Sequence, residues 1–388
     1  MHILEPADVD ELSSVLREAS AARRTLVPVG NRTRLKTLPP SAASASLLTL
    51  KRMPIGMDHV AGDLVATLPA SMTLADANRA LGREGQWLPL DPPFASSTTI
   101  GGIVSANESG PRRYRYGAPR DVIIGISMML ADGRMAKAGG RVVKNVAGYD
   151  LARLMCGSLG SLAVITSATF KLSPIAQASR TVVAALPSTD RLADLVQALV
   201  NAPITPSTIE LVGPPLQLLI RVESTPKAAD HMAKAAAAIC LAYAAPASIP
   251  LNGDENAVWD EAERAVWNQQ GSVLKVSVLP TDVAYLVGEI SRGCDANRVS
   301  WSVFGRAALG VLFVRVDGDP QAIRSLVADW RHRASVHDGS LVVHSAALGL
   351  ASIPRWGDAP AAMPMMRAIK ARFDPHGILS PGMGPGGL

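Results

Sequence analysis

Three glycine turns separated by apolar runs dominate residues 91–174 and constrain this chain more than any other feature. They lie at residues 98–102 (TTIGG), at residues 139–140 (GG) and at residues 157–160 (GSLG). Glycine lets the backbone approach a ligand closely, and the bare N–H groups of such turns bind phosphate oxygens well. Residues 162–170 follow as a β-branched run that predicts a buried strand. We therefore expect an α/β domain that holds a phosphate-bearing cofactor through its backbone.

The composition argues against several other classes of protein. The 388 residues are 48% hydrophobic and 18% charged, with a net charge of +5, which is typical of a globular enzyme. Residues 112–115 (RRYR) form a short basic cluster, more typical of a solvated loop or an anion contact than of a nucleic-acid surface. The three cysteines are far apart, so we expect a reducing cytoplasm, no disulfide framework and no iron–sulfur motif. The seven histidines show no metal-binding spacing, so no metal site is predicted.

The sequence carries no recognisable targeting or membrane-spanning segment. The first residues, MHILEPADVDEL, are acidic and lead at once into a predicted helix, so we expect no signal peptide. The longest uncharged run, residues 235–253, contains Pro246 and Pro250 and is mostly alanine, which makes it a poor membrane span. Any membrane association is therefore expected to come through a partner.

The periodicity of apolar residues divides the chain into two parts that differ in their order of predicted helices and strands. The first part predicts a helix over residues 6–24, a strand ending at Gly30, a helix capped by Thr73, and a hairpin that turns at Asp132-Gly133. After residue 174 two runs of the order β-α-β-β-α-β follow, joined by a helix over residues 255–269 that carries Trp259 and Trp267. That order predicts ferredoxin-like elements, and the two tryptophans are expected in core or interdomain packing.

The order of the turns resembles the FAD-binding domain of the vanillyl-alcohol oxidase, or PCMH-type, flavoprotein family. Residues 99–102 (TIGG), Asn107, residues 115–117 (RYG), residues 120–121 (RD) and residues 157–160 fall where that family has TIGG, Asn, RYG, RD and GSLG. Residues 139–151 (GGRVVKNVAGYDL) resemble more narrowly the FAD-binding E subunit of the bacterial glycolate oxidase complex, and Lys144 and Tyr149 in that segment are candidates for cofactor or interface contacts. The resemblance implies FAD as the cofactor, and it implies a set of cofactor-binding residues. These are Pro28, Gly30, Asn31, Arg32, Thr33, Thr98, Thr99, Gly101, Gly102, Asn107, Tyr116, Gly117, Asp121, Gly160 and Ile165.

One loop departs from the family pattern. Where the family has P-x-G-G-G-T, this chain has Pro28-Val29-Gly30-Asn31-Arg32-Thr33, so Asn31 is the candidate for a left-handed conformation in place of a glycine. Arg32 or Arg34 is expected to bring charge to the pyrophosphate. The loop contains no histidine, so a covalent histidyl link at that position is excluded and FAD should bind non-covalently. Asp121 is expected to cap a turn rather than to act as a catalytic acid.

The resemblance also implies the fold and the domains. We expect an α+β protein with a PCMH-type FAD-binding domain of two α/β subdomains at residues 1–175. A ferredoxin-like α+β cap domain on the substrate side is expected at residues 176–350. The tail at residues 351–388, which contains FDPHGILSPG, should return to the FAD domain. Ser380 stands where the family usually has asparagine, and His376 is expected to be a surface turn residue.

The residues for substrate chemistry are harder to find. Oxidation of a 2-hydroxy acid needs a base for the hydroxyl proton and a cation for the carboxylate. Relatives that oxidise D-2-hydroxy acids carry a cap signature resembling H-x-x-G-D-G-N-x-H, and this chain has none. Arg306 and His344 are weak catalytic candidates, and the catalytic base is not identified.

Three hypotheses follow from the resemblance. The first is an FAD-binding subunit of a glycolate oxidase-type complex, which acts with a companion FAD subunit and an iron–sulfur subunit on a small 2-hydroxy acid. The second is a self-sufficient FAD-dependent 2-hydroxy acid dehydrogenase, and the third is a non-catalytic scaffold. The missing signature favours the first. The expected location is the cytoplasm, with any attachment to the inner membrane made through the complex.

Overall fold

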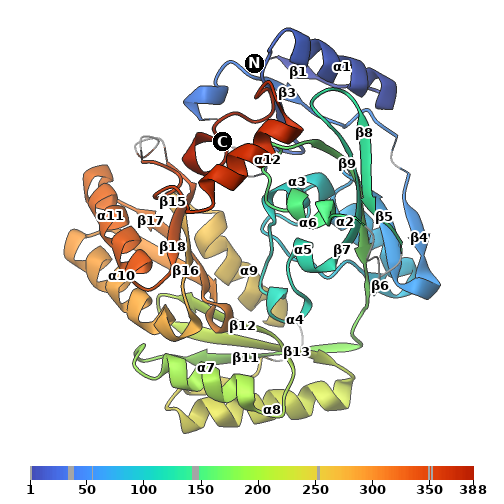
Figure 1. Cartoon of the computed structure of the whole chain (residues 1–388). Helices are drawn as coiled ribbons and strands as arrows, with labels where there is room; N and C mark the ends of the chain where they lie inside the picture. Colours follow the sequence, from blue (N-terminus) through green and yellow to red (C-terminus); the bar gives the residue numbers. More distant parts are fainter. Residues whose placement is uncertain are drawn as a thin grey trace. The chain divides into compact units, whose positions relative to one another are not determined.

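The computed structural model of the protein describes residues 2–33, 39–54, 56–141, 148–250, 254–347, 350 and 353–388. The chain forms two units (Figure 1). The first comprises Met1–Gly110, Tyr116–Ile175 and Asp358–Leu388, and the second comprises Pro111–Arg115 and Ala176–Gly357.

Two sheets and their helices build the first unit. A small parallel sheet has the order β1 (Ile3–Leu4), β3 (Ser46–Leu48), β2 (Leu26–Pro28), and helix α1 (Val9–Ala21) buries Leu12 and Leu16 against it. A larger antiparallel sheet has the order β4 (Asp58–Val60), β5 (Val65–Pro69), β9 (Val164–Lys171), β7 (Ile123–Met129), β8 (Met135–Gly139). Helices α2 (Leu74–Leu81), α3 (Ile100–Ala106) and α6 (Leu151–Met155) share a core with this sheet. The remaining elements are β6 (Gln86–Trp87), α4 (Arg113–Tyr116), which ends in this unit, α5 (Pro119–Val122), β10 (Ser173–Pro174) and α12 (Met363–Phe373).

Local sequence signals explain several of these elements. Thr73 caps α2 by accepting a hydrogen bond from the Asp76 N–H at 3.1 Å, as its position in the sequence predicts. The turn between β7 and β8 contains Gly133 at a φ of +80°, which confirms the hairpin predicted at Asp132-Gly133. Residues 100–106 continue the first glycine turn as helix α3, which no pattern in the sequence predicted.

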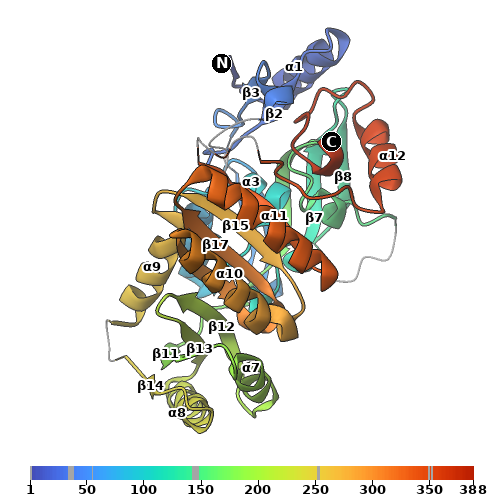
Figure 2. The same ribbon diagram turned by 90° about the vertical axis from the view of Figure 1, so that its left-hand side faces the viewer.

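The second unit is built on one eight-stranded antiparallel sheet made of two ferredoxin-like repeats, as predicted. The first repeat is β11 (Ala178–Ala185), α7 (Leu192–Asn201), β12 (Pro206–Gly213), β13 (Gln217–Ser224), α8 (Pro226–Ala242) and β14 (Ala247–Ser248). The second is β15 (Ser272–Ser277), α10 (Val283–Asn297), β16 (Ser300–Arg306), β17 (Val311–Asp317), α11 (Pro320–Val336) and β18 (Ser340–Ser345). The order is β14-β11-β13-β12-β16-β17-β15-β18, so the pair β12–β16 joins the repeats. Figure 2 shows α10 and α11 together along the second repeat.

The two faces of this sheet differ in chemistry. Side chains alternate along a strand, so Leu218, Ile220 and Val222 of β13 enter the apolar core, which also contains side chains of α7 and α8. The alternate residues Arg221 and Glu223 point to the opposite face, which we call the polar face. Helix α9 (Asp254–Trp267) packs on β12, β16 and β17. The polar face therefore holds charged side chains that are largely buried.

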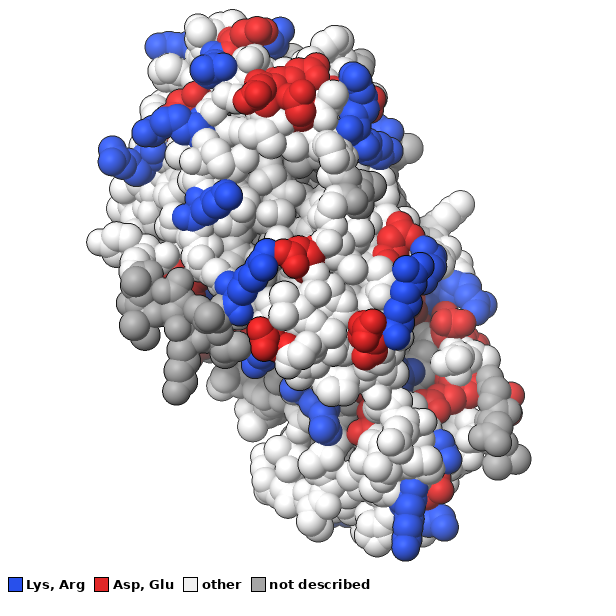
Figure 3. Space-filling model, turned by 90° about the vertical axis from the view of Figure 1, so that its right-hand side faces the viewer, with Lys and Arg blue, Asp and Glu red and all other residues white. Residues whose placement is uncertain are grey.

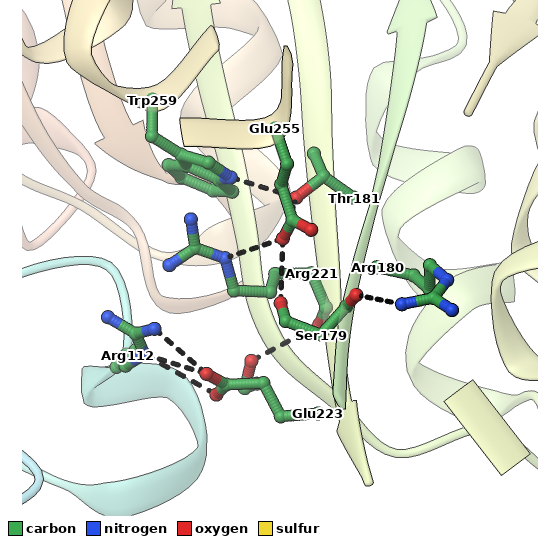
Figure 4. Close-up of polar contacts among 9 residues, drawn as sticks. Arg112, Ser179, Arg180, Thr181, Arg221, Glu223, Glu255 and Trp259 are labelled. Carbon is green, nitrogen blue, oxygen red and sulfur yellow. Dashed lines mark hydrogen bonds and ion pairs between the residues drawn. The ribbon is translucent and has the colours of Figure 1, made fainter. Parts of the chain in front are cut away.

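The division into units departs from the prediction at one segment. Residues 1–175 were expected to form one domain, but Pro111–Arg115 belongs to the second unit. Arg112 donates through Nη2 to Glu223 Oε1 at 2.8 Å and through Nε to the same oxygen at 3.1 Å (Figure 4). Arg115 donates to the Thr205 carbonyl at 3.0 Å, and Tyr114 packs on the core of this unit. The basic cluster at residues 112–115 thus contains specific contacts within the protein, in addition to any solvated side chains.

Charge of both signs is spread over the face of the protein that Figure 3 shows. On the face shown in Figure 3, Lys and Arg side chains are interspersed with Asp and Glu, and uncharged surface separates most of them. The net charge of +5 is therefore not gathered into one basic field on that face.

Candidate functional site: a cofactor cleft in the first unit

A cleft in the first unit gathers residues from all of its main parts. Its lining comes from the end of β2, the end of β3, the loop after β5, the start of α3, and the segment that leads into β9. The lining residues are Pro28, Val29, Gly30, Asn31, Leu48, Thr49, Leu50, Lys51, Ala70, Ser71, Thr99, Gly101, Gly102, Ser105, Gly160, Ala163, Val164 and Ile165. Pro28, Gly30, Asn31, Thr99, Gly101, Gly102, Gly160 and Ile165 of the predicted set thus lie together.

The loop after β2 packs directly on the first glycine turn. A Cβ built on Gly30 would lie 3.0 Å from Thr99 Cγ2 and closer still to Thr99 Oγ1, so only glycine fits there. Asn31 donates through Nδ2 to the Ser97 carbonyl at 2.7 Å. The expectation for Asn31 was wrong in one respect, because Arg32 takes the left-handed conformation, with φ of 57°. The Asn31 side chain is instead used to hold the two loops together.

The first glycine turn is fixed from both sides. Thr99 is the N-cap of α3 and accepts a hydrogen bond from the Gly102 N–H at 3.3 Å. The Gly101 N–H donates to the Ala70 carbonyl at 2.9 Å, and a Cβ on Gly101 would lie 2.9 Å from the Ala70 Cβ. The glycines here allow three chain segments to meet closely. Thr98 and Thr33 lie beside the cleft without lining it, and their hydroxyl oxygens are 3.2 Å apart.

The third glycine turn closes the cleft beside β2. The Leu159 N–H donates to the Ser105 carbonyl at 2.7 Å, which ties this turn to the end of α3. Gly160 has a φ of +71°, and a Cβ there would meet Pro28 of β2 at 3.5 Å. Ser105 and Gly160 are both lining residues, so this contact helps to set the shape of the cleft.

The remaining predicted cofactor residues form a separate group around the C-terminal end of α3. Asn107 is the left-handed C-cap of α3, and its Oδ1 accepts a hydrogen bond from the Arg120 N–H at 3.4 Å. Asp121 accepts from the Ala118 N–H at 2.8 Å, which is the capping role expected for it. Gly117 has a φ of +84°, and Tyr116 packs edge-on against Trp87 with ring centroids 5.5 Å apart. None of these four lines the cleft as described.

Sequence reasoning missed the contribution of the segment after β3. Thr49 is 5% exposed, and its Oγ1 has no hydrogen-bond partner among the described residues although it lines the cleft. Lys51 is an exposed cation two residues further on. The available signal was the parallel pairing of β2 with β3, because parallel strands end at the same edge of a sheet.

The cleft fits a cofactor that has both phosphates and an apolar ring system. Backbone turns, the hydroxyls of Thr49, Ser71 and Ser105, and the ammonium of Lys51 suit phosphate and ribose oxygens. Leu48, Leu50, Val164 and Ile165 add apolar surface on the same lining. The orphaned hydroxyl of Thr49 is the observation that most directly calls for a polar ligand group, because a buried polar atom costs free energy without a partner.

The middle glycine turn falls partly outside the described residues. Residues 142–147, which include Lys144 and Asn145, lie there, and so does Arg34. Gly139 has a φ of +71° and packs against Ile124, and Tyr149 is 92% exposed. Tyr149 is thus an exposed aromatic side chain that is available for an interface.

The two catalytic candidates lie on the polar face of the second unit. Arg306 of β16 is 1% exposed, and its Nε lies 3.9 Å from Oε1 of the fully buried Glu210. His344 of β18 packs edge-on against Trp267 and Phe313, with centroids 5.2 and 5.3 Å away. Trp259 stacks on the Arg221 guanidinium at 4.1 Å and donates to Thr181 at 2.9 Å (Figure 4). Both tryptophans are buried, as predicted.

The cysteine thiols and the remaining ionisable side chains show no further reactive site among the described residues. Burial raises the pKa of Cys156 and Cys294 to about 12 and that of Cys240 to about 11, so their thiols stay protonated near neutral pH. Among the residues that the structure describes, no cluster of three or more His, Cys, Asp or Glu is placed to hold a metal ion. Within the same ranges no helix is both long and apolar enough to cross a membrane.

Comparison with known proteins identifies the family of the chain. Residues 1–139 match the family model "FAD binding domain", and residues 214–383 match "FAD linked oxidases, C-terminal domain". The chain therefore belongs to the FAD-linked oxidases with a PCMH-type FAD-binding domain, and it is an oxidoreductase with FAD as its cofactor.

Individual relatives differ in how much of the chain they match. Glycolate oxidase subunit GlcD of Bacillus subtilis (strain 168) is 27% identical over 98% of this chain and 88% of its own length. Glycolate oxidase subunit GlcE of Escherichia coli (strain K12) is 42% identical, but over 30% of this chain and 34% of its own. The solved structure of alkyldihydroxyacetonephosphate synthase matches with a TM-score of 0.73 at 16% identity, covering 97% of this chain and 76% of that one, which shows the shared fold alone. The chain is thus an FAD-linked oxidoreductase of the type that includes glycolate oxidases, D-lactate dehydrogenases and D-2-hydroxyglutarate dehydrogenases, and these matches do not assign it to one subunit.

Proposed function

We propose that this chain is the FAD-binding subunit, of the E type, of a glycolate oxidase complex. It would act with a companion FAD subunit and an iron–sulfur subunit to oxidise glycolate or a similar 2-hydroxy acid to the 2-oxo acid. Its first unit would be the FAD-binding domain, to which the tail from residue 358 returns, and its second unit would be the cap. The location would be the cytoplasm, with any membrane contact made through partners.

This proposal rests on the arginines at the polar face, each of which already lies beside a carboxylate of the protein. Arg306 lies beside Glu210, Arg221 has its Nε 3.6 Å from Glu255 Oε1, and Arg112 forms its two-point contact with Glu223. A substrate carboxylate would have to compete with a protein carboxylate for each of these guanidinium groups, and two of the three carboxylates, Glu210 and Glu223, are buried. The sequence also lacks the H-x-x-G-D-G-N-x-H signature of the self-sufficient relatives. Both observations support substrate oxidation in concert with a partner subunit.

The cofactor would bind in the cleft of the first unit through this chain's own groups. The backbone of the turns at Gly30, Gly101–Gly102 and Gly160 would hold the diphosphate, with Thr49 and Lys51 adding a hydroxyl and a cation. When bound, FAD supplies the hydride-accepting chemistry, and the protein supplies position and electrostatics. The absence of histidine in residues 28–33 supports non-covalent binding.

The test of the cofactor site is Thr49→Val, which keeps the side-chain volume and removes the hydroxyl. The loss of one hydrogen bond should raise the FAD Kd roughly threefold to tenfold. Thr25→Val, at a threonine outside the cleft lining, is the matched control and should leave the Kd unchanged. Equal affinity of the Thr49 variant and the wild type would show that this hydroxyl does not face the cofactor.

The test of the subunit role is a visible spectrum of the chain purified alone, followed by anaerobic addition of glycolate. Flavin bands at about 370 and 450 nm are expected, as for any oxidised flavin. They should remain until the companion subunits are added. Bleaching by glycolate in the isolated chain would instead make it a self-sufficient dehydrogenase, a second candidate favoured by the nearly full-length match to a GlcD subunit. The absence of flavin bands after addition of FAD would reject the proposed cofactor site.

A further inference from the structure

A largely buried lysine in the C-terminal tail, with a side chain 13% exposed, donates hydrogen bonds to segments next to the cofactor cleft. Lys370 of α12 donates through Nζ to the Ser161 carbonyl at 2.7 Å, to Asp374 Oδ2 at 2.6 Å and to the Leu379 carbonyl at 2.8 Å. An ammonium group has three donors, so these three acceptors satisfy it completely. Asp374 is 2% exposed, and it also accepts from the N–H groups of Ile378 at 3.0 Å and of Leu379 at 2.8 Å.

Each end of this network adjoins a chain segment that lines the cleft. Ser161 directly follows Gly160, whose backbone lines the cleft. On the other side, Leu379 forms a parallel bridge with Leu26 of β2, and the Ser380 N–H donates to the Leu26 carbonyl at 2.8 Å. β2 leads into the Gly30 loop. One ammonium group therefore connects the third glycine turn with the segment that supports the first loop of the cleft.

The cost of burying this lysine indicates that its position matters. Desolvation lowers the pKa of Lys370, while the hydrogen bond and charge of Asp374 act in the opposite direction. A salt bridge buried in this way contributes little net stability compared with apolar packing, whereas its directional hydrogen bonds fix geometry. The bonds run to backbone carbonyls on segments that are distant in sequence, which is how a side chain sets the relative position of two loops.

We propose that Lys370 is a positioning residue for the cofactor, which holds the third glycine turn and β2 in the geometry that binds the FAD diphosphate. The inference rests on the proposed placement of FAD in the cleft. Lys370 does not line the cleft and acts only through the backbone of residues 158–161 and through residues 378–380, so its loss should change affinity without removing any direct contact.

The test compares Lys370→Met with Lys171→Met, a control at the exposed last residue of β9. The FAD Kd of each apoprotein is measured well below its thermal transition, so that the folded state alone is sampled. Lys370→Met should raise the Kd by about tenfold or more, in the range seen when supporting groups behind a ligand site are removed. Hydrogen exchange should quicken in the peptide that contains residues 157–162, where Leu159 donates to Ser105. The control should match the wild type in both measurements.

The outcomes separate this inference from the proposed function. An unchanged Kd in a folded Lys370→Met protein, even with a lowered Tm, would leave only a structural role for the lysine and overturn the inference. Failure of the wild type to bind FAD would instead reject the proposed site itself. If Lys370→Met does not fold, Lys370→Gln is measured in the same way, because its shorter side chain keeps an amide NH2 with two donors in place of the ammonium group with three. The same loss of affinity is expected, and an unchanged Kd again counts against the inference.

Discussion

The fit between Gly30 and Thr99 gives the sharpest prediction about the cofactor cleft. In Gly30→Ala the new Cβ would lie inside contact distance of Thr99 Oγ1 and at 3.0 and 3.1 Å from Thr99 Cγ2 and Cβ. Gly30 does not have a positive φ, so the cost is steric rather than conformational. Thr99 must leave the rotamer in which it accepts from the Gly102 N–H, which sacrifices the N-cap of α3.

The magnitude follows from two terms. Loss of the N-cap costs about 1 kcal/mol, and overpacking of a tight contact costs about 1–3 kcal/mol. Gly30→Ala should therefore lower the free energy of unfolding of the first unit by roughly 2–4 kcal/mol. Thr99→Ala alone should cost about 1 kcal/mol through the cap. The double variant should cost roughly 1–2 kcal/mol rather than the sum, because the clashing oxygen and methyl group are gone.

The assay is urea unfolding of the FAD-free protein by pulse proteolysis, scored on peptides from the first unit so that the second unit does not contribute. Gly62→Ala is the matched control, since a Cβ there meets nothing within 4 Å, and it should be neutral or slightly stabilising. Additive effects of Gly30→Ala and Thr99→Ala would refute the steric reasoning. So would a Gly30→Ala protein as stable as the control.

Two further predictions concern ionisable groups. Burial would raise the pKa of Glu223, but the hydrogen bonds and charge of Arg112 outweigh it and hold that pKa below the usual 4.5. The resulting stability is present above the unfolded-state pKa and is lost as the pH falls through the folded one. Glu223→Gln should thus cost about 2 kcal/mol near pH 7, and the difference in urea midpoint from the wild type should shrink below pH 4.5; a constant difference would contradict the assignment. The raised pKa of Cys156 and Cys294, about 12 against an ordinary 9.0, should slow iodoacetamide labelling at pH 8 by about a thousandfold relative to the urea-unfolded chain, as quantified by mass spectrometry; equal rates would refute it.

Much of the fold was predictable because its signals are local. The alternation of apolar residues and the lengths of the helical runs specify the two ferredoxin-like repeats, and Thr73 marks its helix through a cap within four residues. The pairing of β12 with β16 joins the repeats across about ninety residues of chain and leaves no local signal. Strand β14, with two residues, is too short for a period-2 pattern to identify.

Some residues of the cleft were likewise predictable from local sequence, and others were not. The glycine turns could be recognised in the sequence. Gly101 and Gly160 lie where chain segments pack so closely that a Cβ would contact a neighbouring residue. Thr49 and Lys51 belong to no motif and come to the cleft only because β3 runs parallel to β2. Arg32 rather than Asn31 is left-handed, and the Asn31 amide donates to the Ser97 carbonyl, a contact across 66 positions of sequence that no local pattern announces.

The contrast between the two units bears on how the chemistry is divided. The cleft of the first unit offers backbone turns and a hydroxyl without a partner among the described residues, so it is built to accept an additional polar group. On the polar face of the second unit, Arg315 donates to the carbonyls of Ala265 and Gln270, and Arg306 lies beside the fully buried Glu210. Freeing such a cation for a substrate would leave a carboxylate or carbonyl in need of a new partner, which costs about 1–3 kcal/mol for each group. That balance supports the proposed division, in which this chain would hold FAD and a partner subunit would bind the 2-hydroxy acid.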